Sequence, residues 1–172
     1  IIISIITILV AILIFLTTVG IKTDNFNSLI NEKVNEIDPK IKLKLNQVNF
    51  KLNPSNFEFE IFTLDPHLLV NEKKVDLEII KSDLNLLDYL NNKNPISEIS
   101  IISKESNIGQ FTDFINEYDF NLARNLTFKQ IKKGKVKIIS NINFNESNPK
   151  KTKYIINGYV KDAEIKLLNQ SK

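Results

Sequence analysis

Apolar and polar residues alternate along most of the chain beyond residue 40. In residues 40–52 (KIKLKLNQVNFKL) every second residue is apolar up to Leu45, and the alternation resumes in the other phase from Val48. A period of two places the apolar side chains on one face of a β-strand. The pattern therefore predicts a half-buried strand with a β-bulge at Asn46–Gln47, where the phase changes.

The same alternation recurs up to the end of the chain. Two further segments change phase, FEFEIF at 57–62 and VDLEII at 75–80, and in the second Ile79 is in phase with Val75 and Leu77. Because bulges twist and bend strands, these changes predict a curved sheet. We expect strands at 41–52, 56–64, 67–71, 74–82, 96–103, 134–145, 153–161 and 162–168.

Helical periodicity is confined to a few short segments. Residues 22–39 predict an amphipathic helix that Pro39 ends, residues 82–90 predict a strand end followed by a helical turn, and residues 109–126 predict a second amphipathic helix. Only this last helix lies between strands, which excludes an α/β fold. The fold class we expect is mainly β, a curved antiparallel β-meander that forms a groove, with one or two amphipathic helices.

Residues 1–21 (IIISIITILVAILIFLTTVGI) contain no charged residue. About 20 apolar residues suffice to cross a bilayer as a helix. A cleaved signal peptide is the rival interpretation, but its apolar region is about 7–15 residues and ends at a small-residue cleavage site, and no such site follows here. We therefore expect an uncleaved transmembrane anchor at 1–21, a juxtamembrane amphipathic helix at 22–39 and a β-rich groove domain at 40–172.

The distribution of charged residues limits which compartment and which partners the sequence is compatible with. The 23 basic and 20 acidic residues are well mixed, which disfavours a nucleic-acid footprint. Near-balanced charge after residue 21 is compatible with export of the C-terminal side. The densest basic run, 129–137, is either a solvated turn or a contact with anionic lipid headgroups.

Two residue types are missing from the sequence. The chain lacks methionine, so we expect it to be a fragment. It also lacks cysteine, which neither supports nor excludes an oxidising compartment.

Residues that carry chemistry are scarce. His67 is the single histidine, so no histidine-based metal site can form within one chain. It follows a proline in an expected turn, and no nucleophile motif accompanies it. The glycines are isolated, so no phosphate-binding loop is present. We expect a protein that is not an enzyme and has no cofactor.

The arrangement resembles the AsmA-like family, the group of AsmA-, TamB- and YhdP-type repeating β-groove proteins. The resemblance covers nearly the whole chain but rests on alternation with few fixed residues. The segments that carry it are the apolar anchor, IKLKLNQVNFKL, FEFEIFTLD, VDLEIIKSDLNLLDYL, ISEISIISKESNI, IKKGKVKIISNINFN and YIINGYVKDAEIKLL.

The resemblance implies a single-pass protein of the bacterial inner membrane with its soluble part in the periplasm. Its partners would be the inner membrane, phospholipid acyl chains carried along the groove towards the outer membrane, and envelope proteins. Its role would lie in outer-membrane assembly and homeostasis. Family members run to many hundreds of residues, so this chain would be the membrane-proximal end. The candidate groove residues are Ile41, Leu43, Leu45, Val48, Phe50, Phe57, Phe59, Ile61, Val75, Leu77 and Ile79.

Two other interpretations remain open. The first is an anchored extracytoplasmic β-sandwich that acts as an adaptor or structural domain without lipid transport, and the second is a sensor module. In a sandwich Leu43, Phe59 and Leu77 would pack against protein, whereas in a groove they would line an open concave surface. A buried acyl chain gains about 0.8 kcal/mol per CH₂, so a groove needs no catalytic residue to hold lipid.

Overall fold

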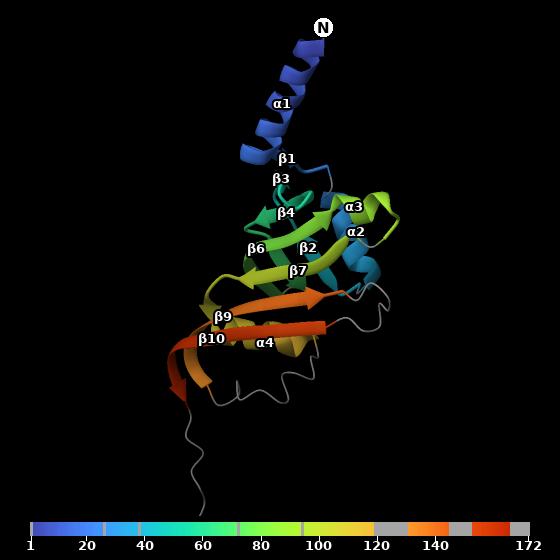
Figure 1. Cartoon of the computed structure of the whole chain (residues 1–172). Coiled ribbons are helices and arrows are strands. Elements are labelled where there is room, and N and C mark those ends of the chain that lie inside the picture. Colours follow the sequence, from blue (N-terminus) through green and yellow to red (C-terminus); the bar gives the residue numbers. More distant parts are fainter. Residues whose placement is uncertain are drawn as a thin grey trace, which may run out of the picture.

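The protein folds mainly as one large antiparallel sheet with short helices (Figure 1). The computed structural model describes residues 2–25, 27–37, 39–71, 73–93, 95–118, 131–144 and 153–165. The expectation of a mainly-β antiparallel fold is confirmed. Parts of the predicted helix 109–126 and of the last predicted strands lie outside the described residues.

The N-terminal helix α1 (Ile2–Thr18) is shorter than the predicted segment 1–21. It ends at Thr18 because Ile21 already belongs to strand β1 (Ile21–Thr23), which pairs with β3 (Val48–Asn53). Its 17 residues extend for about 26 Å at 1.5 Å per residue. Within the part of the chain that the structure describes, no helix combines the length and apolarity needed to span a membrane.

Within the described residues the sheet contains ten strands, and neighbouring strands are antiparallel. Its main path runs β1-β3-β4-β6-β7-β9-β10, while β2 pairs with β5, β5 with β6, and β8 with β9. Strand β10 therefore lies at one edge of the main path. The remaining bounds are β2 (Ile41–Lys44), β4 (Glu58–Leu64), β5 (His67–Val70), β6 (Lys73–Asn85), β7 (Ile96–Ser103), β8 (Ser106–Asn107), β9 (Ile131–Asn143) and β10 (Lys153–Ile165).

The phase change at Asn46–Gln47 lies between two separate strands, β2 and β3. The prediction of a β-bulge within one continuous strand is therefore wrong. β2 pairs with β5, and after the interruption β3 pairs with β4. Opposite it, Asp65 adopts a positive φ of 51° and Pro66, which has no N–H to donate to a ladder, is fully buried. The side-chain nitrogen of Asn46 lies 3.3 Å from the backbone carbonyl oxygens of both Leu64 and Asp65. It thereby links the β2–β3 interruption to the connection between β4 and β5.

A β-bulge in β6 lies at the same level of the sheet. The register with β7 shifts between Leu77 and Ile79, so Glu78 is the extra residue. Leu77 and Ile80 thereby face the core and Ile79 turns to the opposite face. The prediction of a phase change in 75–80 is confirmed, but the prediction that Ile79 continues the row of Val75 and Leu77 is wrong. The predicted change within 57–62 is also wrong, because β4 keeps its register with both neighbours.

The described part of the chain has three further helices: α2 (Asn27–Ile37), α3 (Leu86–Leu90) and α4 (Ile108–Tyr118). α2 lies beside β2, where the side-chain oxygen of Asn31 accepts a hydrogen bond from the backbone N–H of Leu43 at 3.1 Å. The strand end and helical turn predicted at 82–90 are confirmed. α3 begins after Asn85, whose side chain accepts from the N–H of Asp88.

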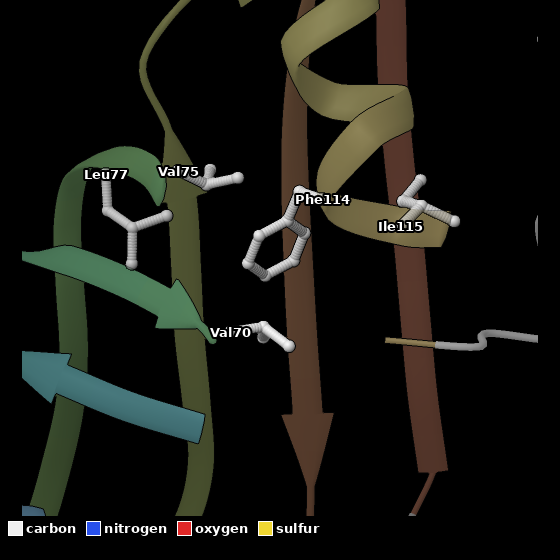
Figure 2. Close-up of a cluster of buried hydrophobic side chains, with 5 residues drawn as sticks. All are labelled: Val70, Val75, Leu77, Phe114 and Ile115. Atoms are coloured by element: carbon white, nitrogen blue, oxygen red, sulfur yellow. The ribbon is translucent and has the colours of Figure 1, made fainter. Parts of the chain in front are cut away.

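The hydrophobic core lies between α4 and the sheet (Figure 2). Phe114 and Ile115 of α4 pack against Val70, Val75 and Leu77 of the strands. Ile41, Leu68, Ile80, Ile101 and Phe111 surround this cluster. The amphipathic pattern of residues 109–118 thus buries its apolar face against the sheet, as the sequence predicts.

Candidate functional site

Helix α1 exposes its apolar side chains along its whole length. None of its residues is buried, and the part of the chain that the structure describes contacts α1 mainly through β3. The side chain of Ile3 is 81% exposed and that of Leu9 60% exposed. Contiguous apolar surface of this kind marks a binding surface for a membrane or another protein.

Gly20 joins α1 to the sheet. The backbone N–H groups of Val19 and Gly20 both donate to the carbonyl of Phe15 at 2.9 Å, and Gly20 has a φ of 73°, the left-handed conformation that ends many helices. A Cβ at Gly20 would lie 2.5 Å from the carbonyl oxygen of Phe50. The junction is therefore short and closely packed, and the sheet begins directly where α1 ends.

Cross-strand register divides the candidate groove residues into separate groups, because directly paired residues share a face of the sheet. Leu43, Val48, Val75 and Leu77 are buried, and Ile41 packs at the border of the core. Val75 and Leu77 lie beneath α4, and Leu77 is only 3% exposed. These side chains contact protein in this structure.

The second group lies on the same face, nearer to α1. Two rows cross the sheet there, one with Leu52, Phe59, Leu84 and Ile96, the other with Phe50, Ile61, Ser82, Ile99 and Ile142. The eight apolar residues of these rows are all half-buried. We call them the apolar strip: Phe50, Leu52, Phe59, Ile61, Leu84, Ile96, Ile99 and Ile142.

One polar residue interrupts these rows. Ser82 lies between Ile61 and Ile99, and its hydroxyl donates to the carbonyl of Glu98 at 2.9 Å. Its hydrogen-bonding requirement is met within the sheet, so the strip can accept an apolar ligand without leaving this hydroxyl unpaired.

Three candidate residues lie outside both groups. Leu45 is in the interruption between β2 and β3, where its carbonyl lies 3.4 Å from the side-chain nitrogen of Asn27. Phe57 precedes β4, with a φ of 54° and an exposed fraction of 61%. Ile79 faces the opposite side of the sheet because of the bulge at Glu78.

Five strip residues were missed as candidates: Leu52, Leu84, Ile96, Ile99 and Ile142. Leu52 belongs to the same alternating row as Phe50 and could have been included on that ground. The others depend on pairing between strands far apart in sequence. Periodicity shows that a strand has an apolar face but does not reveal which residues lie opposite one another.

The opposite face of the sheet carries more charge. Lys81 lies 2.7 Å from Glu60, and Lys137 contacts Glu78. Tyr159 and Lys161 of β10 both donate to Glu105, at 2.9 and 2.6 Å. One apolar row also crosses this face, formed by Leu64, Ile79, Ile102 and Ile139.

These ion pairs shift the pKa values of their members. Hydrogen bonding to Glu60 raises the pKa of Lys81, and hydrogen bonds from Lys161 and Tyr159 lower the pKa of Glu105. Such exposed pairs contribute little stability each, because solvent screens them. The shifts are those of ion pairs on a solvated charged face.

His67 lies beside Asp76. Its Nδ1 atom is 2.8 Å from an Asp76 carboxylate oxygen, and Lys74 reaches the same oxygen at 2.9 Å. A hydrogen bond from Lys74 is the main cause that lowers the pKa of Asp76. Across the described ranges no group of three or more His, Cys, Asp or Glu side chains is placed to hold a metal ion.

Comparison of the chain with protein-family models, with curated proteins and with solved structures found no significant match.

Proposed function

We propose that this chain is the membrane-proximal section of a bacterial envelope protein that takes phospholipid acyl chains from the inner membrane onto its sheet, with the soluble part in the periplasm. The observation that carries the proposal is the apolar strip next to the end of the sheet that joins α1. A helix with no buried residue supplies the anchor, and the strip lies where an acyl chain leaving the bilayer would first meet the sheet.

The energetics of acyl-chain binding support the proposal. Each CH₂ of an acyl chain that leaves the bilayer for water costs about 0.8 kcal/mol, and a methylene group that lies on the strip avoids that cost. The buried residues Leu43, Val75 and Leu77 are assigned to the core that stabilises the sheet, and the lipid-contacting role falls to Phe50, Phe59 and Ile61 with their neighbours. Onward transfer along a longer β-groove would follow the AsmA-like pattern.

Vesicle flotation of the full chain tests the anchor. The double variant Leu9→Arg/Leu13→Arg is expected to leave the vesicles, since Arg at a helix centre costs about 2.5–3.5 kcal/mol on insertion. The matched Leu9→Ala/Leu13→Ala variant should still float. Thermal unfolding of the sheet should not change in either, because neither side chain is buried. Arginine variants that float like the unaltered chain would contradict the anchor.

Mass spectrometry of lipid that co-purifies with the detergent-extracted chain tests the strip. Ile99 and Ile102 are half-buried isoleucines of β7 on opposite faces, so Ile99→Asn and Ile102→Asn form a matched pair. We expect bound phospholipid to fall several-fold in Ile99→Asn alone. Equal lipid in both variants, at equal thermal stability, would contradict the strip as the lipid site.

A second function has one observation in its favour. Leu43 and Leu77 pack against protein, as an adaptor or structural domain with a closed core requires. In that case the chain would be anchored and exported but would bind no lipid. The co-purification experiment separates the two functions, because an adaptor predicts no phospholipid beyond the lipid held by α1, whichever face of β7 is changed.

A further inference from the structure

Exposed apolar side chains gather at the end of the sheet that joins α1. Phe57, Leu87, Tyr89 and Leu90 are 61%, 55%, 63% and 72% exposed. They come from the β3–β4 connection and from α3. We call these four residues the apolar rim.

Register places the rim beside the anchor. β1 leaves α1 and pairs with β3, whose last residue Asn53 pairs with Glu58 of β4. Thr17 of α1 and Pro54 of the β3–β4 connection line the same shallow surface depression. Glu58 in turn pairs with Asn85, directly before α3. Figure 1 shows α3 and the β3–β4 connection at the end of the sheet from which α1 extends.

The backbone of the rim is paired internally. The N–H of Leu86 donates to the carbonyl of Phe57 at 3.1 Å, which ties the two rim segments together. At the other end of α3, the N–H groups of Asn91, Asn92 and Lys93 donate to carbonyls within the helix. A segment whose backbone groups bond to one another can enter an apolar medium at low cost, because those groups lose little on leaving water.

The carboxylate of Glu58, next to the rim residue Phe57, also has hydrogen-bond partners. Both oxygens of the half-buried Glu58 lie 3.4 Å from side-chain nitrogens, one from Asn85 and the other from Asn56. The exposed aromatic and aliphatic side chains at this end lie among exposed polar residues such as Asn56 and Lys93, a mixture suited to the interfacial layer of a membrane. Aromatic side chains with one polar end, such as Tyr89, favour the boundary between headgroups and acyl chains.

We infer that the apolar rim inserts into the interfacial layer of the same membrane that holds α1 and fixes the orientation of the sheet on the bilayer. This inference rests on the proposed membrane anchorage. With α1 alone, the whole chain could tilt and rotate in the membrane. With the rim as a second contact, the end of the apolar strip formed by Leu52 and Phe59 stays at the membrane surface, where acyl chains are available.

Site-directed fluorescence on the full chain tests the inference. The sequence has no cysteine, so each variant carries a single thiol. An environment-sensitive dye is attached at Phe57→Cys or Leu90→Cys in the rim, at Leu9→Cys in α1, and at Lys132→Cys at the opposite end of β9 as the control. The chain is reconstituted in vesicles of phosphatidylcholine with a minority of phosphatidylglycerol, with and without nitroxide-labelled lipids.

The fluorescence emission of the rim labels is expected to shift to shorter wavelength in vesicles, and lipids with a nitroxide near the headgroup should quench it. The Leu9 label should respond to a nitroxide deep in the acyl chain, and the Lys132 label to neither. Rim labels that behave like Lys132 while Leu9 responds would overturn the rim contact and leave the anchor intact. No response at Leu9 would overturn the anchor, and with it the orienting role of the rim. If the rim labels are instead shielded from water in the absence of vesicles, and dilution of the protein removes this shielding, the rim would be a contact surface for a second copy of the chain.

Discussion

Gly20 occupies a position that other residues fill poorly. Its φ of 73° is unfavourable for a residue with a Cβ, and that atom would lie 2.5 Å from the carbonyl oxygen of Phe50. The restriction follows from the close approach of the α1 terminus to β3. The position of α1 relative to the sheet therefore depends on this residue.

Substitution of Gly20 by alanine should lower the free energy of unfolding by about 1–3 kcal/mol, the cost of a strained backbone conformation. Gly109→Ala is the matched control, because nothing lies within 4 Å of the Cβ it would add in α4. Chemical denaturation of both variants measures the difference. A Gly20→Ala variant as stable as Gly109→Ala would mean that the junction is not strained.

Asp76 provides a pH-dependent contribution to stability. Its pKa in the folded protein is lowered chiefly by the hydrogen bond from Lys74. A carboxylate with a lowered folded pKa stabilises the fold above its unfolded pKa, and this contribution is lost as the pH falls through the folded pKa.

Asp76→Asn should therefore destabilise the protein near neutral pH by less than about 1 kcal/mol, since the pair is partly exposed. The difference from the unaltered protein should shrink as the pH falls below the ordinary carboxylate range. Asp113→Asn, at an exposed position on α4, is the control. Denaturation at a series of pH values measures the effect, and a difference that grows on acidification would contradict the sign.

At the scale of elements, β6 decides which apolar residues face the core. The bulge at Glu78 keeps Val75 and Leu77 under α4, and turns Ile79 away, between Leu64 and Ile102. A strand without the bulge would have placed Ile79 in the core and Ile80 outside.

Leu77→Ala and Ile79→Ala test this arrangement as a pair. Removing a buried leucine side chain costs about 2–5 kcal/mol, because the contacts are lost and a cavity remains. The half-buried Ile79 on the other face should cost closer to about 1 kcal/mol. Equal losses in thermal or chemical unfolding would indicate that both side chains share one face.

Local pattern was enough to predict most strands, the turn at α3 and the apolar face of α4. It was not enough for features that depend on pairing. The phase change at Asn46 looks like a bulge in one strand, yet its meaning depends on Asp65 and Pro66, which lie opposite only after folding. The end of α1 was misplaced because Ile21 is as apolar as the helix, and only its pairing with Phe50 makes it a strand.

The candidate groove residues show the same division. Alternation identified Phe50, Phe59 and Ile61, which share one face through direct pairing or along one strand. It could not distinguish them from Val75 and Leu77, which have the same pattern but lie under a helix. Which residues α4 covers depends on tertiary structure. The sequence alone therefore does not distinguish the covered part of the face from the uncovered part.

At the scale of the whole molecule, three regions follow one another along the sheet. The exposed helix α1 and the apolar rim lie at one end, the apolar strip follows, and the core sealed by α4 lies at the far end. This order places the uncovered apolar residues next to α1. We therefore propose that lipid contacts the region near α1, whereas the region under α4 stabilises the fold.

Photo-crosslinking at Phe59 and Phe62 tests this central claim most directly. Both are half-buried phenylalanines of β4, but Phe59 pairs with Leu52 and Leu84 whereas Phe62 lies between Asn49 and Lys81 on the charged face. A photoreactive phenylalanine analogue is placed at either position in the full chain in native membranes. The account predicts that phospholipid is captured at position 59 and not at position 62. Capture at neither position, or equally at both, would contradict it.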